Sequence, residues 1–194
     1  TAKFSATDSL GTGDDFALIP FQSNSLGDGR LAAAPWAQQT PDPISSASWS
    51  TWAEINAIQA EELGIKEGDV LLIRSTSGEI EVLAYPHPGV RPGVIGIPIG
   101  QGHHTSGRYA EDRGSNVLSI LVDVKDSETG ALAWAATRVR VQRAGKRVKV
   151  PKFEGNVVAR PAEPGVPVLV VGVGETAEAA QEANHHLYQR QFLG

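Results

Sequence analysis

The stretch WAEINAIQAEELGIKEGDVLLIRSTSGEIEVLAYPHPGVRPGVIGIPIGQ, residues 52–101, decides the fold of this chain. Residues 58–63 are mostly helix formers, and Gly64 follows them as a residue that commonly ends a helix in the left-handed conformation. Gly68 and Asp69 then give a turn signal. The stretch therefore begins with a short helix that leads into extended chain.

Three strands fill the rest of the same stretch. Residues 70–74 are apolar and predict a buried strand, residues 75–78 connect, and residues 79–85 return with alternating polarity, so an antiparallel hairpin is expected. Residues 86–93 hold three prolines and two glycines and predict a loop with fixed bends. Residues 94–99 predict a third strand, whose glycine indicates a close backbone approach or a barrel corner.

Two further segments extend this pattern. Residues 117–124 are expected to form a strand or an extended segment, residues 126–130 a turn, and residues 136–142 the last strand. Short strands joined by glycine and proline turns, with little helix, predict a mainly β fold. We expect it to close, or nearly close, into a barrel over residues 50–145.

The flanking regions differ from the barrel in composition. Residues 1–50 are rich in Gly, Pro, Ser and Asp, and apart from a short apolar strand at 16–21 they predict an extended arm with turns. Tryptophans indicate that the arm packs on a surface: Trp36, Trp49 and Trp52. Residues 146–194 begin with a basic patch and predict a linker followed by a polar tail helix at 175–193.

The overall composition excludes several function classes. The chain has 194 residues, of which 41% are hydrophobic and 20% charged, and its net charge of −5 offers no basic field for nucleic acid. No apolar run approaches the roughly 20 residues of a membrane span, so no direct span is predicted. The absence of cysteine excludes a disulfide, a thiolate metal site and an iron–sulfur cluster held by this chain. Methionine is also absent, even at position 1, so initiator removal and processing from a longer protein both stay open.

The loop GQGHHTSGRY at residues 100–109 is the strongest binding candidate. Its glycines let backbone N–H groups approach an anion, and its Thr, Ser, His and Arg side chains add donors. The adjacent His103 and His104 do not easily share one metal ion, and no third ligand lies near them in sequence, so zinc is not expected. The alternative is a mobile surface loop.

Three other patterns are weaker. The glycines at 172 and 174 precede the predicted tail helix, but the third glycine of a dinucleotide turn and room for a βαβ unit are missing. His185 and His186 point roughly 100° apart on a helix and do not chelate one ion. An acidic set lacks EF-hand spacing and predicts a solvated turn: Asp123, Asp126 and Glu128. No Ser/His/Asp arrangement is supported, so we predict no catalytic residue and no metal ligand.

A series of motifs runs in fixed order through residues 14–142. The motifs are WAEIN (52–56), AEELGI (60–65), KEGDV (66–70), SGE (77–79), PGVRPG (88–93), QGH (101–103), GSNVL (114–118), GAL (130–132) and ATRV (136–139). The series resembles the molybdopterin dinucleotide-binding domain, which closes the catalytic subunits of the dimethyl-sulfoxide-reductase superfamily at their C-terminal end. The resemblance implies a double-psi β-barrel of the aspartate-decarboxylase-like class, with short helices.

The arm narrows the resemblance to membrane-associated members. Its motifs at residues 16–21, 27–30, 35–36 and 41–43 are similar to those of polysulfide, thiosulfate and tetrathionate reductases. They are similar as well to the large iron–sulfur subunit of alternative complex III, a quinol-oxidising respiratory complex. The metal-ligating residue and cluster cysteines of such proteins lie in other domains. The resemblance therefore implies that this chain does not catalyse a redox reaction by itself.

Two hypotheses follow from the resemblance. In the first, the chain is a scaffold domain in a complex of the alternative complex III type and has no redox centre of its own. Its partners are then iron–sulfur and cytochrome subunits on the periplasmic or extracytoplasmic face of a membrane. Residues 22–25, QSNS, support this hypothesis, because active members often have a loop rich in His, Ser and Thr there and this stretch has no histidine or arginine.

In the second hypothesis, the barrel covers one half of a bis-molybdopterin guanine dinucleotide cofactor in an active reductase. The resemblance then implies that donors to the phosphates and pterin come from Gln101, Gly102, His103, Tyr109 and Asn116. A third reading is a free-standing barrel module of the decarboxylase or chaperone type, although the chain lacks the self-cleaving Gly-Ser start of that decarboxylase.

Overall fold

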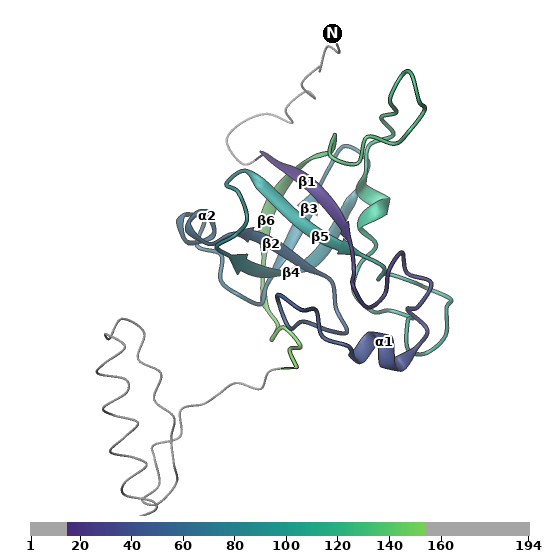
Figure 1. Cartoon of the computed structure of the whole chain (residues 1–194). Coiled ribbons are helices and arrows are strands. Elements are labelled where there is room, and N and C mark those ends of the chain that lie inside the picture. Colours follow the sequence, from purple (N-terminus) through teal and green to yellow (C-terminus); the bar gives the residue numbers. More distant parts are fainter. Residues whose placement is uncertain (1–14, 154–194) are drawn as a thin grey trace, which may run out of the picture. The chain divides into compact units, whose positions relative to one another are not determined.

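Six β-strands close into a barrel in a computed structural model of the chain, which describes residues 15–153 (Figure 1). The strands are β1 (Asp15–Gln22), β2 (Trp52–Asn56), β3 (Asp69–Arg74), β4 (Glu79–His87), β5 (Val94–Ile99) and β6 (Arg138–Arg147). Around the barrel they follow the order β1-β5-β2-β4-β3-β6. None of the helices in residues 15–153 is long and apolar enough to cross a membrane.

Two parallel strand pairs, β1 with β5 and β2 with β4, lie among antiparallel pairs. Because β1 and β5 are parallel, the two long connections that follow them, residues 23–51 and 100–137, leave the barrel at the same end. This mixed, closed arrangement confirms the expected double-psi β-barrel. The loops of both connections are therefore placed to meet.

The predicted helix and hairpin are confirmed. The helix α2 (Ala57–Glu62) begins at Asn56, whose side chain accepts hydrogen bonds from two backbone N–H groups, and Gly64 ends its last turn with a φ of 66°. Strands β3 and β4 pair antiparallel, with Ser75 N–H donating to the Gly78 carbonyl (2.9 Å) in the connection.

Aliphatic side chains from all six strands fill the barrel interior. The largest that are fully buried on the strands are Phe16, Leu18, Ile55, Leu71, Ile73, Ile95, Ile97 and Val139. On the outer face, Gly96 lies between β1 and β2, and a Cβ there would be 3.4 Å from the Phe21 ring and 3.7 Å from a Glu54 carboxylate oxygen. The glycine in β5 thus makes room for two neighbouring side chains rather than for a close backbone approach or a barrel corner.

Other expectations from the sequence need correction. Residues 117–120 form a 3-10 helix, η1 (Val117–Ile120), instead of extended chain, because Asn116 caps it and Val117 and Ile120 are buried three residues apart. The arm contains a helix, α1 (Pro35–Gln39), with proline in its first turn. Of the tryptophans expected to pack on a surface, Trp52 is 4% exposed but Trp36 is 72% exposed.

Two boundaries also differ from the sequence expectation. β4 continues to His87 and β6 to Arg147, so both strands are longer than predicted. β1, assigned to the arm, is a full member of the barrel, while the division of the chain at residues 50 and 145 stays a prediction. The predicted tail helix, the glycines at 172 and 174 and the histidines at 185 and 186 lie outside the described residues.

Candidate functional site

The loop after β5 carries all of the residues predicted to bind a cofactor. They are Gln101, Gly102, His103, Tyr109 and Asn116. Gly102 draws the two ends of this loop together: its N–H donates to the Arg113 carbonyl (2.8 Å), and a Cβ at Gly102 would overlap the backbone of Asn116. The structure therefore brings Gly102 and Asn116 into direct contact, as a shared site requires.

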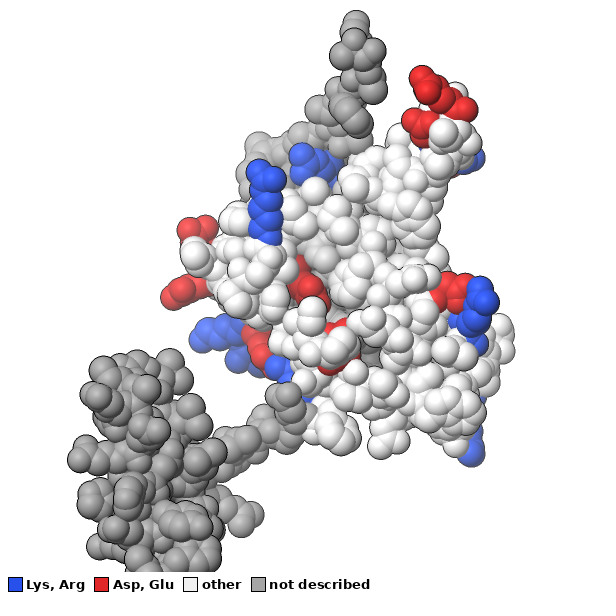
Figure 2. All heavy atoms as spheres, in the orientation of Figure 1, with Lys and Arg blue, Asp and Glu red and all other residues white. Residues whose placement is uncertain are grey.

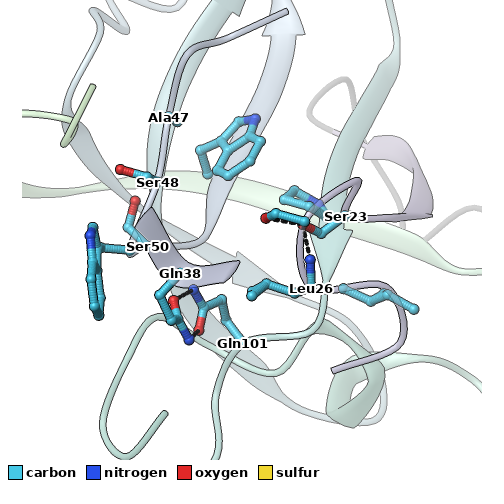
Figure 3. Close-up of a pocket in the computed structure, with 12 residues that line it drawn as sticks. Ser23, Leu26, Gln38, Ala47, Ser48, Ser50 and Gln101 are labelled. Atoms are coloured by element: carbon cyan, nitrogen blue, oxygen red, sulfur yellow. Dashed lines mark hydrogen bonds between the residues drawn. The ribbon is translucent and has the colours of Figure 1, made fainter. Parts of the chain in front are cut away.

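Gln101 is tied to the arm by a reciprocal pair of amide hydrogen bonds. Its Nε2 donates to Gln38 Oε1 (2.7 Å), and Gln38 Nε2 donates to Gln101 Oε1 (3.2 Å) and to the Ala32 carbonyl (2.9 Å). Gln38 is 1% exposed and Gln101 is 7% exposed. In Figure 3 the two amides face each other at one end of a pocket. Buried amides require such partners, so this pair holds α1 against the loop.

His103 packs against the turn at residues 27–30. Its Nε2 lies 3.2 Å from the Gly100 carbonyl, and a Cβ at Gly29 would be only 3.1 Å from the same nitrogen. Gly29 has a φ of 104°, which favours glycine. The histidine side chain is thus enclosed by its own loop and by the arm.

The two remaining predicted residues make local contacts. Arg108 donates to the Tyr109 hydroxyl and its guanidinium lies 4.6 Å from the tyrosine ring centroid. Asn116 Oδ1 accepts from Leu118 N–H (3.1 Å), which caps η1, and the Asn116 side chain is exposed. Tyr109 is therefore held by its neighbour in sequence and not by the other predicted residues.

Thr51, which directly precedes β2, holds the C-terminal end of the loop, at residues 114–115, by hydrogen bonds. Its hydroxyl donates to the Ser115 carbonyl (3.1 Å) and accepts from Ser115 N–H (2.9 Å), and Thr51 is 2% exposed. Gly114 has a φ of 56°, and a Cβ there would be 2.8 Å from the Thr51 nitrogen. The hydroxyl and the glycine together fix the backbone next to Asn116.

A narrow pocket with room for about one water molecule lies where the arm meets this loop. Its lining residues are Ser23, Ser25, Leu26, Gln38, Ala47, Ser48, Trp49, Ser50, Trp52, Pro98, Ile99 and Gln101. Figure 3 shows Ser48 and Ser50 on one side and Ser23 with Leu26 on the other. Ser50 Oγ is buried without a hydrogen-bond partner among the described residues. Trp52 Nε1 donates to a carboxylate oxygen of Glu54 (3.2 Å), and burial raises the pKa of Glu54.

Most residues of this pocket were missed by sequence reasoning. The arm residues at 38 and 47–50 carry no motif, and only their contacts with Gln101 and β2 bring them to the site. Residues 22–25 were noted because they lack histidine and arginine, and Ser23 indeed uses its hydroxyl locally, accepting from Leu26 N–H (3.2 Å).

The pocket side chains do not fit a phosphate group. Pyrophosphate needs cations or several converging N–H donors, and every side chain that lines the described pocket is uncharged. Arg113 lies against Trp49, which lines the pocket, with its guanidinium 5.3 Å from the ring centroid, and Arg30 pairs with Asp28 (2.7 Å). The pocket is suited to a neutral polar group the size of about one water molecule, beside Trp49 and Trp52.

The acidic set forms the expected turn. Asp126 Oδ1 accepts from Thr129 N–H (2.8 Å), Thr129 Oγ1 (2.7 Å) and Glu128 N–H (3.2 Å), which uses the carboxylate within the turn. Among the described residues, no group of three or more His, Cys, Asp or Glu side chains is placed to hold a metal ion.

The amide pair gives a first prediction. Replacing Gln38 by methionine leaves the Gln101 amide buried and unpaired, so we expect a loss of about 2 kcal/mol in the free energy of unfolding. Replacing both glutamines by methionine removes the need for pairing and should recover most of that loss. Urea denaturation of the two single variants and the double variant measures the coupling. A double variant that loses the sum of both single effects would contradict the reciprocal pair.

Comparison with known proteins adds to this geometry. The family model described as "Molydopterin dinucleotide binding domain" matches residues 36–131. The molybdopterin-containing subunit of the arsenate respiratory reductase of Chrysiogenes arsenatis is 35% identical over 140 residues, which cover 66% of this chain and 16% of the relative. The menaquinone reductase molybdopterin-binding-like subunit of Nitratidesulfovibrio vulgaris is 23% identical over 128 residues, which cover 66% of this chain and 18% of the relative.

A solved structure supports the fold. Acetylene hydratase from Pelobacter acetylenicus superposes with a TM-score of 0.50 at 17% identity, over 66% of this chain and 18% of that chain. The chain thus spans less than one fifth of the length of these relatives. The family match, the relatives and the closed barrel agree with one another, and the chain belongs to the molybdopterin dinucleotide-binding domain family of the dimethyl-sulfoxide-reductase superfamily.

Proposed function

We propose that this domain is a scaffold part of a larger membrane-associated respiratory oxidoreductase subunit, in a quinol-oxidising complex of the alternative complex III type. The domain has no redox centre of its own in this proposal. Its partners are the other domains of the parent subunit together with iron–sulfur and cytochrome subunits, on the periplasmic or extracytoplasmic face of the membrane.

One observation carries the scaffold role: the side chains expected to bind a cofactor already have structural partners. Gln101 pairs with Gln38, His103 contacts the Gly100 carbonyl, and Asn116 caps η1. A ligand that recruited these groups would have to replace internal hydrogen bonds, which offsets much of its binding free energy. Gln101 is the one of these three side chains that lines the described pocket, which has room for about one water molecule.

A relative also supports this proposal. The Nitratidesulfovibrio vulgaris protein is named a molybdopterin-binding-like subunit of a menaquinone reductase. Its name describes a subunit that resembles a molybdopterin-binding subunit and that belongs to an enzyme acting on menaquinone. We propose that the parent subunit of this domain is likewise a molybdopterin-binding-like subunit of a complex that acts on a quinone or quinol.

The second candidate is a domain that covers a bis-molybdopterin guanine dinucleotide cofactor in an active reductase. It is favoured by the Chrysiogenes arsenatis relative, which is named as molybdopterin-containing. In this case the contacts to the cofactor come from Gln101, Gly102, His103, Tyr109 and Asn116, and the Asn116 side chain is exposed.

Metal and pterin content of the purified parent complex separate the two candidates. The scaffold proposal expects neither molybdenum nor tungsten in a stoichiometric amount with this subunit, and no fluorescent pterin after acid and iodine oxidation of the isolated subunit. Stoichiometric metal together with fluorescent pterin in that subunit would overturn the scaffold role and support the second candidate. Measuring the isolated subunit matters, because metal held elsewhere in the complex would otherwise be counted.

A further inference from the structure

Residues 122–137 form a hairpin-like loop that projects from the barrel and holds one antiparallel bridge, Lys125 with Leu132, and we call this segment the ribbon (Figure 1). Ala133 N–H donates to the Val124 carbonyl (2.8 Å), and Asp126 N–H donates to the Ala131 carbonyl (2.8 Å). At its base, the buried Thr137 accepts from Val122 N–H through its hydroxyl (3.0 Å). The Thr137 carbonyl also accepts from Leu18 N–H on β1 (2.9 Å), so the ribbon is shaped by its own hydrogen bonds and anchored to the barrel at its base.

The ribbon exposes large apolar side chains instead of covering the core. Trp134 is 48% exposed and Val124 is 41% exposed, and residues 123–131 are all exposed. Two-stranded ribbons without a hydrophobic face against another surface are marginally stable in water. Tryptophan is also the residue type most enriched among the anchors of protein interfaces. The shape and the exposed tryptophan together indicate a docking element.

The tip of the ribbon is acidic. It carries Asp126 and Glu128, while Asp123, nearer the base, pairs with Lys125 (3.3 Å). Figure 2 shows acidic side chains gathered at the end of the ribbon. Thr129 hydrogen bonds lower the pKa of Asp126, so its carboxylate stays ionised at neutral pH. A partner surface must therefore offer positive charge around the apolar contact, since like charges at an interface are strongly unfavourable.

We propose that the ribbon docks on another domain of the parent subunit, where Trp134 fills an apolar pocket rimmed by lysine or arginine. This inference rests on the proposed function, in which the domain is part of a larger subunit. The chain spans 16% of the length of its Chrysiogenes arsenatis relative. The remaining domains of such a subunit are joined covalently to this one, which gives them a high effective concentration at the ribbon.

Site-specific photo-crosslinking in the full-length parent subunit tests this docking. A photoreactive amino acid in place of Glu128, at the exposed tip, is expected to link to a lysine- or arginine-containing peptide of another domain of the same polypeptide. Peptide mass spectrometry identifies that link. The same amino acid in place of Ser77, in the exposed β3–β4 connection, should not reach that peptide.

Two tryptophan variants test whether the crosslink depends on Trp134 in particular or on any exposed tryptophan. In the Glu128-labelled protein, W134S should lower the crosslink yield at least tenfold. W36S removes a tryptophan that is more exposed, at 72%, but lies on α1 outside the ribbon, so the yield should stay unchanged.

Several outcomes overturn the docking proposal: no link from the tip, links only to a second copy or to a different subunit, or an equal loss of yield in both tryptophan variants. The native mass of the protein is measured in parallel. A mass equal to this chain by itself would remove the proposed function as well. A larger native mass together with no crosslink from the ribbon would contradict only the docking proposal and leave the proposed function in place.

Discussion

The variant G102A is expected to lose about 4 kcal/mol in the free energy of unfolding. Gly102 has a φ of 84°, a conformation that costs an alanine about 1–2 kcal/mol. In addition, an alanine Cβ would lie 2.5 Å from the Ser115 carbonyl carbon and 2.7 Å from the Asn116 Cα. These are backbone atoms, which cannot rotate away as a flexible side chain does. The loop must therefore open, which costs a further 1–3 kcal/mol, roughly.

The same loop supplies a matched control. Gly107 has a φ of 85°, almost identical to that of Gly102, and a Cβ there would meet nothing within 4 Å. G107A should therefore lose only about 1 kcal/mol, the backbone part of the effect. Urea denaturation followed by tryptophan fluorescence measures both variants. Equal losses would show that the contact between Gly102 and the Asn116 backbone does not hold the loop closed.

This pair of glycines shows how far sequence reasoning reaches at the site. The glycine-rich loop after the third strand of the opening stretch was identified from sequence, because glycine and neighbouring donors in a row indicate backbone recognition. Which glycine closes the loop was not visible, because Gly102 and Gly107 look alike in sequence. Their roles differ only through contacts with residues 115–116, which the fold brings close.

The pocket was missed for a related reason. Gln38 lies in a part of the arm without a motif, 63 residues before its partner Gln101. A polar residue buried by one distant hydrogen-bond partner leaves no periodic pattern in the sequence. The barrel strands behaved differently, because alternating polarity and turn residues are local signals, and strands such as β5 were predicted with the bounds they have.

The extended prediction for residues 117–124 was wrong over residues 117–120, and the reason is a helix cap. Apolar residues in this segment suggested a strand, but Asn116 precedes them and its side chain accepts from Leu118 N–H (3.1 Å). An asparagine cap competes with extended backbone and favours a helical turn. Val117 and Ile120 then reach the core together from one turn.

The second large effect is expected at Asp69, the buried carboxylate between β3 and β6. Arg147 Nε lies 2.8 Å from Oδ1, Arg143 Nε lies 3.4 Å from Oδ2, and Lys66 N–H donates to Oδ2 (2.9 Å). Asp69 is 3% exposed, whereas both arginine side chains are about half exposed. Breaking a fully buried ion pair costs about 3–5 kcal/mol. Since the arginines can regain water, we expect D69N to lose about 2–3 kcal/mol at pH 7.

An exposed ion pair on the same sheet provides the comparison. Arg74 and Glu79, on β3 and β4, approach to 2.6 Å, and both side chains are 55% exposed. E79Q should lose less than about 1 kcal/mol, because exposed pairs are screened by solvent. A similar loss in D69N and E79Q would show that burial adds nothing to the Asp69 interaction.

The pH dependence of D69N distinguishes an ionic contribution from packing. The hydrogen bond from Arg147, together with the Lys66 N–H and the charges of both arginines, lowers the pKa of Asp69 in the folded chain. The stabilisation by this carboxylate is therefore complete above the unfolded-state pKa of about 3.9 and is lost as the pH falls through the lower folded-state pKa. The difference in unfolding free energy between the wild-type chain and D69N should be constant from about pH 8 to pH 5 and shrink below about pH 4. Urea denaturation across this range measures it, and a difference that stays the same at the lowest pH would mean that packing, and not charge, accounts for the loss in D69N.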